Sequence, residues 1–190
     1  MLALLPPSVD LHASWLRARA EWPTGHQDGS GLRPDDLVET PEGFSSWLDR
    51  LRREADGETR PGSGQVPSTR WWIVEESEYL GVIELRHELT PAMIDGVGHV
   101  GYSVRPSARG RGVATWALRE TLPHAWSLGL PSVLVTCDEG NEASARTIER
   151  NGGVLEDVRD TARGRKRRYW ISGPEPRPRL QPRRETNRAR

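Results

Sequence analysis

A glycine-rich segment between a strand pattern and a helix pattern constrains this chain more than any other feature. The segment 109–114 reads RGRGVA, follows the strand-like run 99–104 and opens the helix-like run 113–128. Gly110 and Gly112 let the backbone turn tightly and approach a ligand closely. A helix that begins there directs unpaired N–H groups and the positive end of its dipole at one point. The sequence therefore predicts an anion site that suits a pyrophosphate.

The N-terminal third predicts a short strand and two helices. The strand covers residues 2–5, and Ser8 is placed to cap the helix that follows. Apolar residues recur at intervals of three or four in both helices. They are Leu11, Trp15, Ala18 and Trp22 in the first helix, and Phe44, Trp47, Leu48 and Leu51 in the second. Thr40 and Pro41 mark the start of the second helix, since threonine caps well and proline suits the first helical position.

The rest of the chain predicts a sheet with two further helices. Strands are indicated by runs rich in β-branched and aromatic residues. They cover residues 71–75, 80–85, 99–104, 132–137, 154–158 and 167–171, the last two being joined by a turn at 161–164. Helices are predicted at 113–128, with a kink or break at Pro123, and at 141–150. Loops are predicted at 23–39, 57–68 and 90–98, where glycine, proline and polar residues show no period.

The glycine-rich segment and its neighbours carry a family resemblance. The spacing Arg-x-x-Gly-x-Ala, preceded by a strand that ends in residues 102–106, resembles the coenzyme A pyrophosphate loop of the GNAT superfamily of acyl-CoA N-acyltransferases. Downstream, the strand 133–137, the helix with Asn141 and Ser144, and the turn 151–153 follow in the order that this family requires. The resemblance covers residues 70–171 well and the N-terminal third loosely. The P-loop pattern Gly-x-x-x-x-Gly-Lys-Ser/Thr is absent from the sequence.

The resemblance implies both the fold and the reaction. The fold is α+β, with a mixed, mostly antiparallel sheet of about six to seven strands, helices on both faces, and a gap between the strands before and after the glycine-rich segment. The reaction is transfer of an acetyl group from acetyl-CoA, as co-substrate, to a primary amine in a ternary complex. The details are most similar to the branch of ribosomal-protein N-terminal acetyltransferases. No metal is implied.

The resemblance also assigns the donor site. Backbone N–H groups of residues 109–114 bind the pyrophosphate, the main chain of residues 102–104 pairs with pantetheine, and Asn141 contacts the pantetheine arm. The candidate residues are Ser103, Val104, Arg109, Gly110, Arg111, Gly112, Val113, Ala114 and Asn141. Either arginine can equally be a solvated loop residue, and Asn141 can equally be a helix N-cap.

The general acid departs from the family pattern. Many relatives have a tyrosine seven residues after the asparagine to protonate the leaving thiolate, and here that position is Ile148. Ser144, one turn earlier, and Tyr102 are possible substitutes, although Ser144 can be a small packing residue and Tyr102 a core residue. These two are the candidate acids.

The general base also departs from the family pattern. Relatives often carry a glutamate at the start of the strand before the loop, where this chain has Gly98 and His99. A histidine can act as a base near neutral pH, so His99 is the first candidate, although a strand histidine is often structural. Glu84 and His87, on the preceding strand, are the next candidates. Cys137 has no base near it in sequence and is interpreted as a strand residue, not a nucleophile.

Charge is distributed unevenly along the chain. Residues 159–190 hold 12 basic and 3 acidic residues, which leaves 15 basic and 24 acidic residues in 1–158. An acidic body favours a cationic acceptor, such as a polyamine, an aminosugar or a protein N-terminus. The arginine-rich end suggests nucleic acid, but interleaved prolines favour a disordered tail, so no nucleic-acid partner is expected. We expect an acetyltransferase domain at 1–172 and a tail at 173–190.

The remaining expectations concern location, partners and an alternative function. No stretch approaches the ~18 apolar residues of a membrane span, so we expect no membrane partner and a cytoplasmic location. The acceptor is a small-molecule or peptide amine, and the oligomeric state is left open, with a homodimer as one option. The missing tyrosine and glutamate also keep open a non-catalytic acyl-CoA-binding or sensory module.

Overall fold

The computed structural model describes residues 1–22, 27–56 and 66–174. The predicted tail, except for its first two residues, and most of the loop predicted at 57–68 lie outside these residues. Within them, no helix is both long and apolar enough to cross a membrane.

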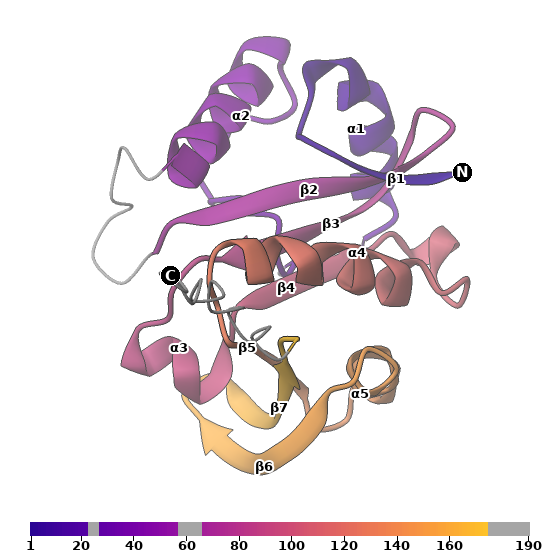
Figure 1. The fold of residues 1–190 in the computed structure, drawn as a ribbon. Helices are drawn as coiled ribbons and strands as arrows, with labels where there is room; N and C mark the ends of the chain where they lie inside the picture. The colour runs from indigo at the N-terminus through magenta and orange to yellow at the C-terminus, as the bar shows by residue number, and fades with distance from the viewer. Residues whose placement is uncertain (23–26, 57–65, 175–190) are drawn as a thin grey trace, which may run out of the picture.

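The described residues form a seven-stranded sheet in the order β1-β2-β3-β4-β5-β7-β6 (Figure 1). The strands are β1 (Leu2–Leu5), β2 (Ser68–Glu75), β3 (Glu78–Arg86), β4 (Val100–Val104), β5 (Ser132–Asp138), β6 (Val154–Thr161) and β7 (Gly164–Ser172). Neighbouring strands are antiparallel except β4 and β5, which are parallel. The mixed, mostly antiparallel sheet predicted from the sequence is therefore confirmed.

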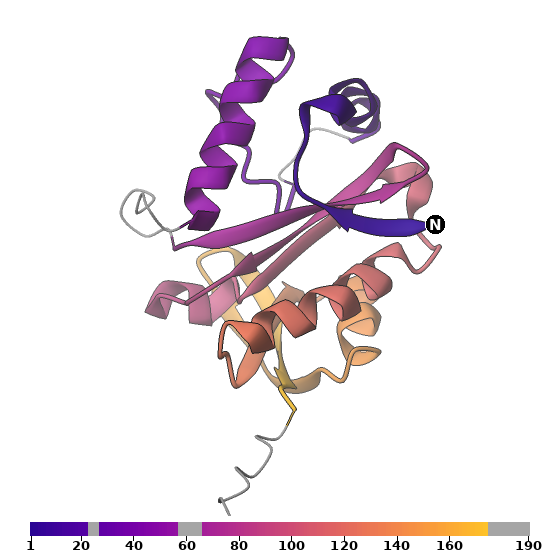
Figure 2. The ribbon, with the colours of Figure 1, turned by 45° about the horizontal axis from the view of Figure 1, so that its top comes forward.

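Helices cover both faces of this sheet, as expected. They are α1 (His12–Ala20), α2 (Pro41–Asp56), α3 (Pro91–Gly96), α4 (Val113–Ser127) and α5 (Glu142–Glu149). Figures 1 and 2 show α1 and α2 on one side of the sheet and α4 and α5 on the other. Two short 3-10 turns, at Val9–Leu11 and Pro106–Ala108, precede α1 and the glycine-rich segment.

Two apolar cores lie on the two faces because side chains alternate along each strand. On β2, Trp72 and Val74 join the core beneath α1 and α2, whereas Ile73 joins the core beneath α4 and α5. The helical stripes predicted in the N-terminal third fill the first core. Trp15 and Trp47 are each 2% exposed there, so they pack the interior and do not line a surface cleft.

The helix predicted from Thr40 and Pro41 is present as α2. The Thr40 hydroxyl accepts a hydrogen bond from the N–H of Gly43 at 3.1 Å, which caps the first turn. The same two-residue signal occurs at Thr90 and Pro91, where a loop was predicted, and that prediction is wrong. Helix α3 forms there, and the Thr90 side chain accepts from the N–H of Met93.

Helix α4 continues through Pro123, so of the kink or break predicted at this residue the break does not occur. Proline removes only one N–H from the helix, the one that would have bonded to the carbonyl of Arg119. Arg119 and Pro123 are both exposed, so water can take the place of that donor. The closing hairpin is formed by β6 and β7 across residues 161–164, as predicted, with longer arms.

Candidate active site

The strands β4 and β5 separate almost at once. They share a single residue pair, Val100 with Val135. On its other edge, β4 remains paired with β3. Just beyond one end of β4, the N–H of Arg105 donates to the Leu80 carbonyl at 2.8 Å. Just before the other end, the His99 carbonyl accepts from the N–H of Arg86 at 2.8 Å. The odd-numbered residues of β4 thus bond to β3, so the main-chain groups of the even-numbered residues point into the gap beside β5.

Among those even-numbered residues, Tyr102 and Val104 lie beyond the single pair that β4 forms with β5. Their N–H groups have no hydrogen-bond partner among the described residues, because β5 has turned away to pair with β7. The gap predicted between the strands before and after the glycine-rich segment is therefore confirmed. An extended ligand lying in it can pair with β4 as an added strand does.

The glycine-rich segment lies where β4 leads into α4. Gly110 and Gly112 have φ angles of +77° and +78°, and a Cβ added to either would meet nothing within 4 Å. Gly112 is the N-cap of α4 but offers no side-chain acceptor to the helix. The first helical bond runs from the N–H of Trp116 to the Gly112 carbonyl at 3.0 Å. We call residues 110–115 the amide cradle, because their N–H groups have no partner among the described residues.

The two arginines of the segment are both engaged. The Nε of Arg109 donates to the Val104 carbonyl at 3.1 Å and so ties the segment to the end of β4. The Nη2 of Arg111 lies 2.5 Å from Oε2 of Glu75, and this hydrogen bond is the main cause that lowers the pKa of the Glu75 carboxyl. Arg111 remains half exposed, with 51% of its side chain accessible, so a phosphate can compete with Glu75 for it.

Asn141 is the N-cap of α5. Its Oδ1 accepts a hydrogen bond from the N–H of Ser144 at 3.1 Å, so the alternative N-cap interpretation is confirmed. The cap uses only the oxygen of an exposed side chain, which leaves the Asn141 amide nitrogen able to donate to a ligand.

The two candidate acids form one pair. The Tyr102 hydroxyl lies 2.7 Å from the Ser144 hydroxyl and 3.4 Å from the Ser144 carbonyl. Burial raises the pKa of Tyr102 above its ordinary value, although the hydrogen bond to Ser144 acts in the opposite direction. Cys137 of β5 is 6% exposed, and its pKa is raised by burial and lowered in part by a hydrogen bond from Ser144. Side chains from β4, β5 and α5 thus meet at the gap, with a hydroxyl pair that stays protonated at neutral pH.

His99 occupies a different environment. It is 7% exposed, and its Nδ1 accepts a hydrogen bond from the N–H of Leu134 at 2.9 Å. Burial, and then the charge of Arg86, lower the pKa of His99 to about 4. The ring is therefore neutral at pH 7 and serves as an acceptor for the backbone of β5. Residues 99 and 102 also face opposite sides of β4. These observations favour a structural role for His99.

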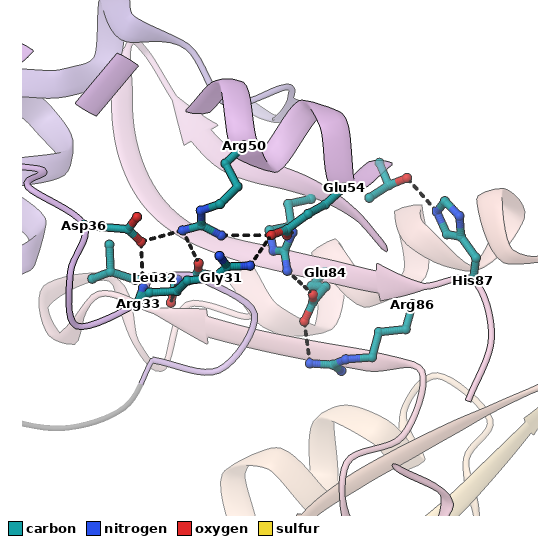
Figure 3. Close-up of polar contacts among 12 residues, drawn as sticks. Gly31, Leu32, Arg33, Asp36, Arg50, Glu54, Glu84, Arg86 and His87 are labelled. Carbon is teal, nitrogen blue, oxygen red and sulfur yellow. Dashed lines mark hydrogen bonds and ion pairs between the residues drawn. The ribbon is translucent and has the colours of Figure 1, made fainter. Parts of the chain in front are cut away.

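Glu84 and His87 are also held by neighbours. Glu84 is 3% exposed and lies 2.5 Å from both Arg70 and Arg86, in a buried ion cluster (Figure 3). The Nε2 of His87 lies 2.8 Å from the Thr69 hydroxyl, and burial lowers the pKa of His87. The structure therefore brings Tyr102 and Ser144 together but not the three candidate bases with them.

The fold also places an acidic residue that the sequence did not single out. Asp28 lies in the loop between α1 and α2, and its negative charge acts on both Tyr102 and Arg86. No periodicity or motif marks Asp28, because its position depends on how the loop packs against β4. Among the described residues, no group of three or more His, Cys, Asp or Glu side chains could hold a metal ion.

Comparisons with known proteins agree with this geometry. A family model described as an acetyltransferase (GNAT) domain matches residues 6–154. A comparison with curated proteins found no match.

Several solved structures have the same fold. RimJ from Mycobacterium smegmatis, in complex with CoA-disulfide, is 20% identical, with 90% of this chain and 82% of that chain covered and a TM-score of 0.65. The ribosomal-protein-S5-alanine acetyltransferase from Vibrio fischeri is 20% identical, with coverage of 92% and 93% and a TM-score of 0.63. The microcin C7 self-immunity acetyltransferase MccE, in complex with acetyl-CoA and AMP, is 15% identical, with coverage of 90% and 92% and a TM-score of 0.62.

Proposed function

Because the chain belongs to the GNAT family of acetyltransferases, we propose that it transfers an acetyl group from acetyl-CoA to the N-terminal amine of a peptide or protein. The observation that carries this proposal is the amide cradle at the mouth of the gap between β4 and β5. Six consecutive residues, 110–115, offer N–H groups without partners, at the N-terminus of a 15-residue helix. Such an arrangement binds phosphate groups through hydrogen bonds and through the helix dipole.

The donor would lie along β4. Its diphosphate sits on the amide cradle, where the space above Gly110 and Gly112 is open. The pantetheine arm follows the unpaired edge of β4, with the Tyr102 main chain and the Asn141 amide as hydrogen-bond partners. The N–H of Val104 points into the gap and polarises the thioester carbonyl, which stabilises the oxyanion that forms during attack.

The transfer itself requires one bond to form and one to break. The neutral amine attacks the thioester carbon, a C–N bond forms, and the C–S bond breaks with the electron pair leaving on sulfur. The hydroxyl pair of Tyr102 and Ser144 donates a proton to this thiolate, because the raised pKa of Tyr102 keeps its hydroxyl protonated. Ile148 lies fully buried in the core at the position where many relatives have tyrosine, so this pair acts in its place.

The attacking amine loses its proton on the face of β4 opposite the Tyr102 side chain. His99 accepts a backbone hydrogen bond and has a pKa of about 4, and Glu84 is paired with two arginines. His99 already accepts a backbone hydrogen bond and Glu84 is already held by two guanidinium groups, so we propose that water at the mouth of the gap accepts the proton. Most of the acceleration then comes from holding donor and acceptor together.

The acceptor assignment rests on two observations. Similar folds include acetyltransferases named for ribosomal proteins, among them the Vibrio fischeri enzyme. The excess of acidic residues in 1–158 attracts a positively charged amine. We place this activity in the domain at 1–172.

The proposal is tested by incubating the protein with acetyl-CoA and a panel of amines, while free thiol is measured. The panel contains hexapeptides with free Ser, Ala or Met N-termini, spermidine and glucosamine, and an N-acetylated hexapeptide serves as the blank. We expect thiol release with at least one free N-terminal peptide and none with the blank. Tight binding of coenzyme A without transfer to any amine would instead favour the non-catalytic module.

A further inference from the structure

The turn at 151–153 follows α5, and the transfer step described above assigns it no role. The chain folds back sharply here. Gly152 has φ = +83°, and the N–H of Gly153 donates to the Ile148 carbonyl at 3.0 Å. A Cβ added to Gly153 would collide with the Ile148 side chain, so glycine is required at this position. The tight turn brings the side chain of Asn151 back alongside α5.

The Asn151 side chain closes the end of α5. Its Nδ2 donates to the Thr147 carbonyl at 2.9 Å. In a continuing helix the backbone N–H of residue 151 would be the donor to this carbonyl, but that N–H bonds to the Ile148 carbonyl instead, at 3.0 Å. The side-chain amide therefore satisfies a carbonyl that the end of the helix leaves without its usual backbone partner.

The same nitrogen reaches α4, which lies with α5 on one face of the sheet (Figure 2). Nδ2 of Asn151 donates to the Thr115 carbonyl at 3.1 Å, and Thr115 is the last residue of the amide cradle. An amide NH2 group has two protons, one for each carbonyl. The hydroxyls of Thr115 and Thr147 lie 3.4 Å apart, which adds a second polar contact between the same two helices. Asn151 thus bridges the start of α4 and the end of α5.

The two bridged helices hold opposite ends of the proposed donor site. Helix α4 begins at the amide cradle, where we place the diphosphate. Helix α5 carries Asn141 and Ser144, and the Ser144 hydroxyl lies 2.7 Å from that of Tyr102. Because one coenzyme molecule has to fit both ends, the position of α5 relative to α4 decides where its sulfur lies relative to the hydroxyl pair.

We infer that Asn151 is a positioning residue for acetyl transfer, whose side-chain amide sets the distance between the amide cradle and the hydroxyl pair. The inference rests on the proposed function, from which it takes the diphosphate site and the proton donor. Asn151 acts on the site only through the two helices. Without the bridge, the cradle still binds the diphosphate, but α5 no longer holds the hydroxyl pair at the right distance from the sulfur.

The test compares Asn151→Ala and Asn151→Asp with the matched control Thr121→Val. Alanine removes the amide, whereas aspartate keeps its shape and replaces the donor group by an acceptor. The Thr121 hydroxyl donates to the Ala117 carbonyl at 2.9 Å, so Thr121→Val also removes a side-chain hydrogen bond to a helix carbonyl, but one that lies within α4. Asn151 is partly exposed, so water can reach the carbonyls that lose their donor and both variants should fold. Thermal unfolding checks this.

The first measurement separates turnover from donor binding. Misplacement by about 1 Å can cost up to 100-fold in rate, so both Asn151 variants should lower kcat about tenfold and leave the Kd of coenzyme A within about twofold. Thr121→Val should keep the wild-type kcat. An unchanged kcat in the folded Asn151 variants, a loss that Thr121→Val shares, or a matching rise in the Kd of coenzyme A overturns the inference while the proposed function stands.

A shortened donor provides a second measurement that a merely structural role would not move. Acetyl-pantetheine lacks the diphosphate, so the cradle does not anchor it and the bridge has nothing to align. The ratio of kcat/KM for acetyl-CoA to that for acetyl-pantetheine should therefore fall about tenfold in both Asn151 variants and stay constant in Thr121→Val. A constant ratio in the Asn151 variants overturns the inference. Failure of the wild type to bind coenzyme A, or to acetylate any amine of the panel, overturns both the inference and the proposed function.

Discussion

Gly112→Ala probes the amide cradle with little change in volume. Gly112 has φ = +78°, and a Cβ there meets nothing within 4 Å, so the only intramolecular cost is backbone strain. An alanine in the left-handed region costs about 1–2 kcal/mol. For a chain of this size, each 1 kcal/mol lowers Tm by roughly 2–4 °C.

The effect on donor binding should be larger. The new methyl group would enter the open space above the cradle, where we place the diphosphate, and relief of the strain would turn the neighbouring N–H groups away. Loss of one hydrogen bond to a charged phosphate costs about 1.5–3 kcal/mol. The Kd for coenzyme A should therefore rise roughly 10- to 100-fold.

Gly129→Ala is the matched control. Gly129 follows the other end of α4, has φ = +81°, and likewise has nothing within 4 Å of an added Cβ. Both variants should lose similar stability in thermal unfolding, and only Gly112→Ala should lose affinity in calorimetric titration with coenzyme A. If the two variants bind coenzyme A equally well, the reasoning that places the diphosphate at the N-terminus of α4 is refuted.

Two other predictions concern single side chains. Tyr102→Phe and Ser144→Ala should each lower kcat about 100-fold with acetyl-CoA KM nearly unchanged. Because the two hydroxyls act as one pair, the kcat of the double variant should be little lower than that of either single variant. Additive losses of kcat, measured by stopped-flow thiol release, would contradict this prediction. The pKa of His99 falls from 6.5 to about 4 on folding, so the unfolded chain binds the extra proton. His99 should not affect the free energy of unfolding above pH 6.5, and should lower it by about 3 kcal/mol in total as the pH drops towards 4. In urea titrations, His99→Gln should lose less unfolding free energy than the wild type over the same pH range.

Local signals predicted most of the fold. The stripe that includes Phe44 and Trp47 specifies α2 because helical periodicity is contained within about ten residues. The tight turn at Gly110 and Gly112 could also be predicted from the sequence, because a left-handed backbone conformation is a local property that favours glycine. The helix α3 was missed although its Thr-Pro start matches that of α2, because six residues carry too little apolar periodicity to distinguish a helix from a loop.

The contacts that decide the chemistry of the site could not be predicted from local sequence signals. Tyr102 and Ser144 are 42 residues apart, and only the folded chain brings their hydroxyls within hydrogen-bond distance, so that they form one pair instead of two alternatives. The environment of His99 depends on the N–H of Leu134, which lies on another strand. Asp28 carries no local signal, since its place is set by the contact of Gly29 with Gly101. In each case the partner lies far away in sequence, where spacing rules do not reach.

Amide NMR of the cradle tests the central claim most directly. In a ¹⁵N-labelled sample, addition of coenzyme A should shift the amide proton resonances of Gly110, Gly112 and Val113 downfield, because their N–H groups then donate to phosphate oxygens. Pantetheine, which lacks the diphosphate, should leave them nearly unchanged. Resonances that stay in place while the protein binds coenzyme A would contradict the account.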